Sequence, residues 1–210
     1  AELGVPNTYT DFEEMCKNPE LDAIIIVSPS FLHCQQIEIA MNHGKHVFCE
    51  KPLGTDVAQC KAAEKVIEAH PDLIFQLGFM RRFDPDYIKM KKILDSGELG
   101  APLMAHCISR TRSHPKNHTT EQHITNIAIH EIDICRWLLG ENLNEVAVRF
   151  PRATCFAEGT CQDPQLVLMQ SDSGVLIDVE VSGNSYYGYE ILCELVCEKG
   201  TIRLPVAAEP

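Results

Sequence analysis

The chain has 210 residues, of which 45% are hydrophobic, and a formal net charge of -12 at pH 7. This composition allows a sizeable core and excludes global disorder, while the acidic charge argues against nucleic acid or an anionic membrane as the main partner. No apolar run approaches the roughly 20 residues that span a bilayer, and the N-terminal residues lack the basic and apolar regions of a signal peptide.

Residues 1–80 alternate strand and helix patterns. The run Ala23–Val27 is continuously apolar, as is typical of a strand buried on both faces. Gly44 fits the position after a helix end, and Thr55 fits a helix N-cap with Asp56 in the first turn. The pattern predicts strands over 22–28, 47–49 and 73–77 and helices over 31–43 and 55–70. Strands that alternate with helices indicate a parallel sheet.

Beyond residue 80 the pattern changes to consecutive strands. Pro85 suits the first turn of a helix that ends before Gly97, and Asp172–Gly174 suits a hairpin turn. We expect a further helix over 125–139 and strands over 102–112, 145–150, 165–170, 175–181 and 189–198. The sequence therefore predicts an α/β protein with two domains: residues 1–80 with a parallel sheet, and residues 81–210 with a mostly antiparallel open sheet.

Lys51 is the first candidate for chemistry. It follows the short apolar strand Val47–Cys49 and lies in Glu50-Lys51-Pro52. Ligands of open α/β sheets bind at the carboxyl ends of the strands, where an amine can hold a hydroxyl or carry its proton. The alternative is a solvated lysine in a loop.

A second candidate group lies on the predicted helix over 125–139. Asn126, His130 and Asp133 are spaced four and three residues apart and share a helix face. His130 can take a proton near neutral pH, and Asn126 can orient its ring. The alternatives are a helix with one satisfied histidine, or a metal site that adds His123. Because His123 lies two turns from His130, that spacing is poor for shared ligation, and no metal is assigned.

Two further segments are ambiguous. Arg81 and Arg82 follow a predicted strand and can bind an anion or polar substrate, or pair with acidic neighbours. The tyrosines of the segment Tyr186–Tyr189 are more typical of packing residues than of ligands.

The ten cysteines include no Cys-x-x-Cys pair. Several lie in apolar surroundings, which favours buried free thiols in a reducing compartment, with the cytoplasm as the expected location. A disulfide framework or a zinc site is the alternative.

In order along the chain, four motifs resemble the glucose-fructose oxidoreductase and inositol dehydrogenase family, and inositol 2-dehydrogenases in particular. The motifs are Phe48-Cys-Glu-Lys-Pro52, Gly78-Phe-Met-Arg-Arg82, His130-Glu-Ile-Asp133 followed by Trp137, and Tyr187-Gly-Tyr189. Glu-Lys-Pro alone is unspecific, whereas the ordered set covers nearly the whole chain.

The resemblance implies a Rossmann domain that holds NAD or NADP, and a second α/β domain with an open sheet through which the protein forms homo-oligomers. It implies that Lys51 contacts the reacting hydroxyl of a small polyol or sugar and that His130 is the acid/base. The residues that it places near the cofactor are Ser28, Pro29, His33, Glu50 and Lys51. Those that it places near the substrate are Arg81, Asp133 and Tyr189.

The chain departs from the family pattern in two respects. Inositol dehydrogenases usually have Asp where this chain has Asn126, which cannot supply charge to a protonated His130. The chain also lacks Gly-x-Gly-x-x-Gly and begins near the family's third strand, so we expect it to be part of a longer protein.

The leading hypothesis is thus an NAD(P)-dependent oxidoreductase of polyols or sugars, inositol-like in substrate. Its rival is a non-catalytic binding or assembly protein on the same scaffold, which Asn126 and the missing phosphate loop favour. A thiol-based redox protein is a distant third.

Overall fold

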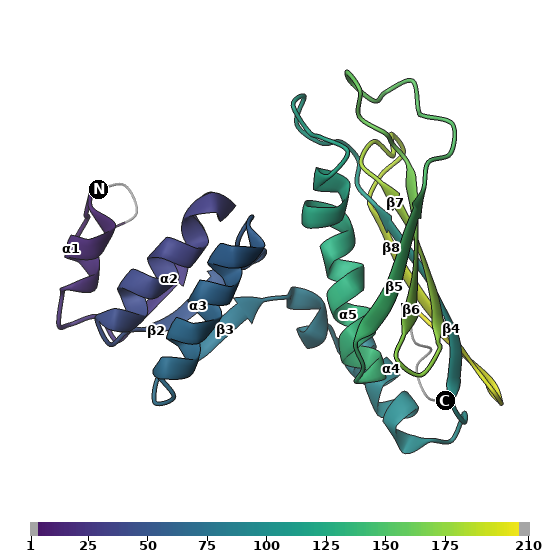
Figure 1. Cartoon of the computed structure of the whole chain (residues 1–210), viewed down its shortest axis with the longest axis horizontal. Coiled ribbons are helices and arrows are strands. Elements are labelled where there is room, and N and C mark those ends of the chain that lie inside the picture. Colours follow the sequence, from purple (N-terminus) through teal and green to yellow (C-terminus); the bar gives the residue numbers. More distant parts are fainter. Residues whose placement is uncertain (1–3, 206–210) are drawn as a thin grey trace. The chain divides into compact units, whose positions relative to one another are not determined.

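The computed structural model describes residues 4–205. They form two compact units that divide between Phe79 and Met80 (Figure 1). None of the helices in this part of the chain is long and apolar enough to cross a membrane.

The first unit contains a three-stranded parallel sheet in the order β1-β2-β3. Its strands are β1 (Ala23–Ile26), β2 (His46–Glu50) and β3 (Phe75–Gly78). Its helices are α1 (Phe12–Cys16), α2 (His33–Asn42), which follows the short 3-10 helix η1 (Ser30–Leu32), and α3 (Val57–Ala69). The predicted alternation of strands and helices and the parallel pairing are confirmed, whereas α1 was not expected.

The expectation that the first strand is buried on both faces is wrong for the residues described. Ile24 and Ile26 pack with Val47 and Cys49 into a core that α1, α2 and α3 cover. Ile25 and Val27 point the other way and are 70% and 71% exposed. An apolar run cannot by itself say how many faces of a strand are covered, because successive side chains alternate between the faces.

The helix ends follow the capping chemistry with one change. Gly44 lies just past the end of α2 with φ 73°, as expected for a glycine in the left-handed region. Asp56, and not Thr55, caps α3, because its carboxylate accepts a hydrogen bond of 2.9 Å from the backbone N–H of Gln59. In the second unit, Asp84 caps α4 (Pro85–Ser96), and Gly97 follows the end of this helix as predicted, in the left-handed region.

The second unit contains a six-stranded sheet in the order β5-β6-β7-β4-β8-β9. Its neighbours pair antiparallel except β4 with β7, so the predicted mostly antiparallel sheet is confirmed. The strands are β4 (Pro102–Arg110), β5 (Leu143–Arg149), β6 (Gln165–Ser171), β7 (Leu176–Ser182), β8 (Glu190–Cys197) and β9 (Gly200–Arg203), the last not foreseen. The turn after Ser171 joins β6 and β7 as the expected hairpin.

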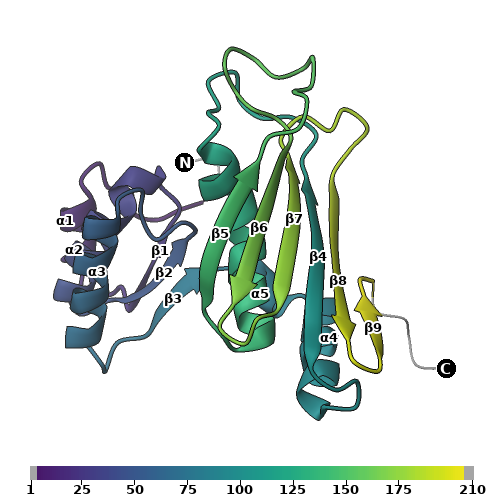
Figure 2. The ribbon, with the colours of Figure 1, turned by 45° about the vertical axis from the view of Figure 1, so that its right-hand side comes forward.

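Helices α4 and α5 (Ile129–Leu139) cover one face of this sheet, and none of residues 80–205 forms a helix on the opposite face (Figure 2). Met90 of α4 and Leu138 of α5 are buried against Ala105, Ile177 and Leu195 of the sheet. The charged and polar side chains of β4 and β7 that alternate with this core therefore line the other face.

The helix that carries His130 begins differently from its prediction. Residues His123–Ala128 form a π-helical segment, η3, and the regular helix α5 starts only at Ile129. A prediction from the 3.6-residue period of an α-helix cannot detect this widened turn. Such segments are rare and occur frequently at functional sites.

Candidate functional site

The carboxyl ends of β1, β2 and β3 lie at one edge of the parallel sheet, where Ile26 pairs with Cys49 and Glu50 with Gly78. The chain leaves this edge through Ser28-Pro29 after β1 and through Lys51-Pro52 after β2. In an open α/β sheet, this edge is where ligands bind. The sequence-predicted cofactor residues of the first unit therefore gather at one edge.

His33 joins the two loops at this edge. Its ring is 1% exposed, with Nδ1 at 2.7 Å from the carbonyl oxygen of Pro52 and Nε2 at 2.9 Å from that of Ser28. The side chain of Ser28 donates a hydrogen bond of 2.5 Å to Gln36 of α2. His33 thus links the two loops through its ring nitrogens. Its closeness to a cofactor stays a prediction.

Lys51 follows the last residue of β2 and is half-buried. The neighbouring strand ends at Gly78, where a Cβ would stand 3.1 Å from the ring of Phe48 and 3.3 Å from the Glu50 side chain. Glycine therefore permits the close approach of β3 to β2 beside Glu50 and Lys51. The lysine is presented at the sheet edge, as its position in the sequence predicted.

In the second unit, the predicted substrate residues Arg81 and Asp133 form ion pairs with different partners. Arg81 is 6% exposed, pairs with the buried Glu131 of α5, and places Nη2 at 3.5 Å from the Ser109 hydroxyl. Burial raises the pKa of the Glu131 carboxyl, and the positive charge of Arg81 opposes that rise. The guanidinium is therefore engaged inside the protein.

Arg82, which the sequence left open, holds Asp133. Its Nε donates a hydrogen bond of 2.8 Å to Asp133 Oδ2, and its Nη2 donates to Oδ1. The Asp133 carboxylate is 7% exposed, while the arginine is 40% exposed. Two successive arginines of the short helix η2 (Met80–Phe83) thus clamp the first turns of α5, which carry His130.

The other predicted residues of this unit differ in exposure. His130 is half-buried in the first turn of α5, and Asn126 is exposed on the π-helical segment. Tyr189, which precedes β8, is 66% exposed, and Tyr186 and Tyr187 are exposed to similar extents, so none of the three rings is buried in this unit, although Tyr186 stacks on Phe156. The catalytic and substrate roles of these residues stay predictions.

Sequence reasoning missed Glu131, the buried partner of Arg81. The sequence did contain a signal. Two adjacent arginines could pair with two acidic residues, Glu131 and Asp133, which lie two positions apart on one predicted helix. Sequence alone does not say which pairs form. That assignment needs the packing of η2 against α5, which brings together residues 50 positions apart.

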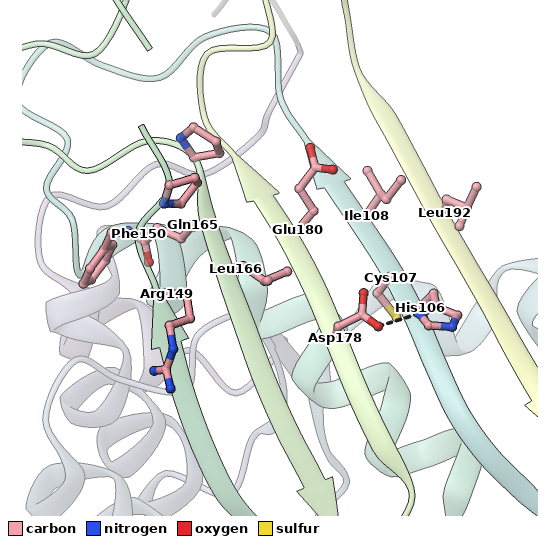
Figure 3. Close-up of a pocket in the computed structure, with 12 residues that line it drawn as sticks. His106, Cys107, Ile108, Arg149, Phe150, Gln165, Leu166, Asp178, Glu180 and Leu192 are labelled. Atoms are coloured by element: carbon pink, nitrogen blue, oxygen red, sulfur yellow. Dashed lines mark hydrogen bonds and ion pairs between the residues drawn. The ribbon is translucent and has the colours of Figure 1, made fainter. Parts of the chain in front are cut away.

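The helix-free face of the second sheet carries a pocket of about 550 Å³ (Figure 3). Ile108, Leu166 and Leu192 supply apolar surface there. Nδ1 of His106 lies 2.5 Å from the Asp178 carboxylate across the paired strands β4 and β7. None of the predicted catalytic or substrate residues lines this pocket, which belongs to the open sheet face.

Comparisons with known proteins agree with the two-unit architecture. Residues 1–79 match the family model described as an oxidoreductase family with an NAD-binding Rossmann fold, and residues 87–203 match the GFO/IDH/MocA C-terminal domain. The chain belongs to the GFO/IDH/MocA family. The second match alone spans more than half of the chain. The two matched domains follow each other along the chain in the order that the four sequence motifs predicted.

The similar proteins include inositol dehydrogenases. The chain is 42% identical over 197 residues to an inositol 2-dehydrogenase of Burkholderia lata and 42% identical over 200 residues to one of Klebsiella pneumoniae. These alignments cover 94% of this chain and 58% of each relative, so the chain spans less than two thirds of their length.

Solved structures give the same result. A myo-inositol dehydrogenase of Lactobacillus casei in complex with NAD(H) and myo-inositol superposes with a TM-score of 0.92 at 31% identity, covering 97% of this chain and 60% of that one. A scyllo-inositol dehydrogenase of the same organism, with NAD(H) and scyllo-inositol, gives a TM-score of 0.86 at 32% identity, covering 97% and 63%.

Proposed function

We propose that the protein is an NAD-dependent dehydrogenase of an inositol-like polyol. The observation that carries this proposal is the position of Lys51, half-buried directly after β2 at the carboxyl edge of the parallel sheet. Relatives named inositol 2-dehydrogenase, at 42% identity, support the choice of substrate class.

The residues at this edge fit a nicotinamide cofactor. The His33 ring contacts the carbonyl oxygen of Ser28 in the loop after β1 and that of Pro52 in the loop after β2. The backbone at the edge is therefore held in place before any ligand binds. Ser28, Pro29, Glu50 and Lys51 are the residues that would hold the cofactor. When bound, the nicotinamide supplies the hydride acceptor.

Oxidation of an alcohol also releases the hydroxyl proton, and residues of this chain must take it. In the proposed reaction, the Lys51 amine binds the reacting hydroxyl and the His130 imidazole accepts its proton. Asn126, one turn before His130, orients the imidazole without adding charge. Tyr189, with its exposed ring, contacts the polyol.

Arg81 and Asp133 are positioning residues in this proposal. Their ion pairs, with Glu131 and Arg82, engage α5 one and three residues after His130. These ion pairs hold α5 against η2, and so they set the orientation of the His130 side chain. Arg81 and Asp133 therefore act on the substrate through the orientation of His130.

Self-association through the helix-free sheet face is part of the same proposal. This face carries the apolar side chains Ile108, Leu166 and Leu192 among ion pairs of the strands (Figure 3). All ten cysteines are free thiols and eight are buried, which supports a reducing compartment such as the cytoplasm. Sedimentation of the wild type and of Ile108→Lys tests the interface, and an unchanged oligomeric state in the variant would refute it.

The experiment on function uses the full-length protein with NAD⁺ or NADP⁺ and myo-inositol, scyllo-inositol or glucose, and follows nicotinamide reduction by absorbance. Lys51→Met should lower kcat/KM by about 10²-fold or more, because a positioned proton-transfer group contributes that much. Lys61→Met, an exposed lysine on α3, is the matched control and should leave the rate unchanged.

Two results would overturn the proposal. A folded protein that binds the cofactor without reducing it in the presence of any of these polyols is a binding protein on the same scaffold. Equal rates for Lys51→Met and Lys61→Met would remove Lys51 from the chemistry.

A further inference from the structure

Three histidines and a cysteine gather at one end of the six-stranded sheet. We call His114, His118, His123 and Cys161 the histidine-cysteine cluster. The topology brings them together: β4 ends at Arg110, which pairs with Ser182 at the end of β7, and Gln165 at the start of β6 pairs with Val181. The loops 111–122 and 150–164 therefore leave the sheet at the same end (Figure 2).

The spacing within the cluster suits a metal ion. One ligand atom from each of His114, His123 and Cys161 lies within 4.8 Å of the others. In tetrahedral coordination with the usual zinc–nitrogen and zinc–sulfur bonds, such atoms stand roughly 3.3 to 3.6 Å apart. Sγ of Cys161 is 3.8 Å from Nδ1 of His123, so this pair needs to close by only a few tenths of an ångström.

A buried carboxylate orients His123 for such a role. Nε2 of His123 lies 3.2 Å from Oδ1 of Asp163, and both side chains are fully buried. Oδ1 of Asp163 also accepts a hydrogen bond of 3.0 Å from the backbone N–H of Gly183, and Oδ2 accepts one of 3.0 Å from Asn184 Nδ2. A carboxylate at Nε2 favours the tautomer with the proton there and leaves the Nδ1 lone pair for a metal.

His118 adds a group that the protein alone does not satisfy. Its Nε2 is buried and has no hydrogen-bond partner among residues 4–205. The ring stacks on His114 with centroids 4.4 Å apart and meets the edge of His123 at 4.8 Å. A buried polar atom without a partner is unfavourable, and a bond to a metal would remove that cost.

Gly183 makes room for the rings at the end of β7. A Cβ at this position would stand 2.5 Å from Cδ2 of His114 and 3.0 Å from Nε2 of His123. The strand end and two imidazoles therefore approach more closely than any other residue type allows.

The competing interpretation is a polar cluster held by hydrogen bonds. His114 supports it in part, because Nε2 lies 2.7 Å from Asn184 Nδ2 and Nδ1 lies 2.9 Å from the Pro115 carbonyl oxygen. Coordination through His114 Nε2 would replace the contact with Asn184, whose amide keeps its bond of 3.0 Å to Asp163. Hydrogen bonding accounts for the Cys161 thiol beside His123 Nδ1, but it leaves His118 Nε2 unsatisfied.

We propose that His114, His123 and Cys161 form a structural Zn²⁺ site that ties loops 111–122 and 150–164 to η3, and that the His118 ring turns out of its stack on His114 to supply the fourth ligand. Four protein ligands close the coordination sphere, which is the mark of a structural and not a catalytic zinc. On binding, the Cys161 thiol loses its proton to solvent and forms the Zn–S bond, with no change of oxidation state. Asp163 is a positioning residue that acts through His123.

The site differs from the one considered in the sequence, which combined His123 with His130 and Asp133. The structure directs the His123 ring to Cys161 and Asp163 instead. The proposal does not depend on the proposed dehydrogenase activity, since its readouts are metal content and spectra.

The test uses the purified full-length protein, stripped with a chelator and titrated with Zn²⁺ or Co²⁺. We expect one metal ion per chain and, with Co²⁺, tetrahedral visible bands together with a thiolate-to-cobalt charge-transfer band. Cys161→Ser should abolish the charge-transfer band. Cys155→Ser changes an exposed cysteine of the same loop and should leave the band intact.

A positioning role for Asp163 predicts a graded effect. Asp163→Asn should retain the spectrum and weaken Kd by about 10–100-fold, the usual effect of losing the carboxylate behind a ligating histidine. Circular dichroism of each variant checks folding, and His114→Gln replaces Cys161→Ser if that variant does not fold.

The proposal is overturned if the folded wild-type protein binds neither ion, or if its Co²⁺ spectrum lacks the thiolate band. It is also overturned if the folded Cys161→Ser variant binds Co²⁺ with the wild-type spectrum.

Discussion

Breaking the buried pair between Arg81 and Glu131 should destabilise the second unit severely. Arg81→Met removes the positive charge but keeps the bulk of the side chain, so Glu131 remains behind without its partner. The Glu131 side chain is 1% exposed and that of Arg81 is 7% exposed, so water cannot replace the lost contact. The reverse change, Glu131→Leu, takes the carboxylate away from a buried guanidinium, which keeps the Ser109 hydroxyl at 3.5 Å.

The size of the effect follows from this burial. Removing one partner of a buried ion pair costs about 3–5 kcal/mol, whereas replacing both partners with apolar groups is often close to neutral. For a protein of this size, about 3–5 kcal/mol corresponds to a fall in Tm of roughly 6–20 °C. We expect the double variant Arg81→Met/Glu131→Leu to recover most of that loss.

Urea unfolding measures the cycle, with fluorescence of Trp137 as the probe, because this tryptophan lies on α5 and packs against the core of the second unit. Lys89→Met is the control. It removes an exposed pair with Asp86 at 3.8 Å, which is worth about 0–1 kcal/mol. The reasoning is refuted if the double variant loses as much stability as the two single variants together. Arg81 would then be available to a substrate.

Three further predictions can be checked separately. Asn126→Asp should raise kcat if His130 accepts the proton, because the carboxylate stabilises the imidazolium; an unchanged pH–rate profile would contradict that role. Asp84→Ala should cost about 1 kcal/mol in urea unfolding through loss of the α4 cap, and Asp84→Asn, which can still accept from Tyr87 N–H, should cost less. Gly183→Ala should lower Co²⁺ affinity by displacing two rings, and wild-type affinity in that variant would show that the approach is not needed.

The sequence by itself determined the elements whose signals are local. Asp84, Pro85 and Gly97 set the ends of α4, and alternating apolar residues set the strands of the second sheet, because capping and side-chain alternation act over a few residues. The position of Lys51 after a strand of a parallel sheet was also readable, since parallel strands deliver their ends to one edge.

The tertiary structure decided which distant residues meet. It paired Arg81 with Glu131 and Arg82 with Asp133, although the sequence suggested a substrate for the first and last of these. It replaced the start of the predicted helix with the π-helical segment that carries His123. The periodicity of a single segment does not predict which distant residues pair.

The histidine-cysteine cluster shows the same limit most clearly. His123 and Cys161 are 38 residues apart and meet because β4, β6 and β7 place their ends together. The sequence supplied the ligand types, and strand order and register supplied the distances between them. Contacts of this kind depend on the pairing of whole strands, which is a property of the packed sheet and not of any one segment.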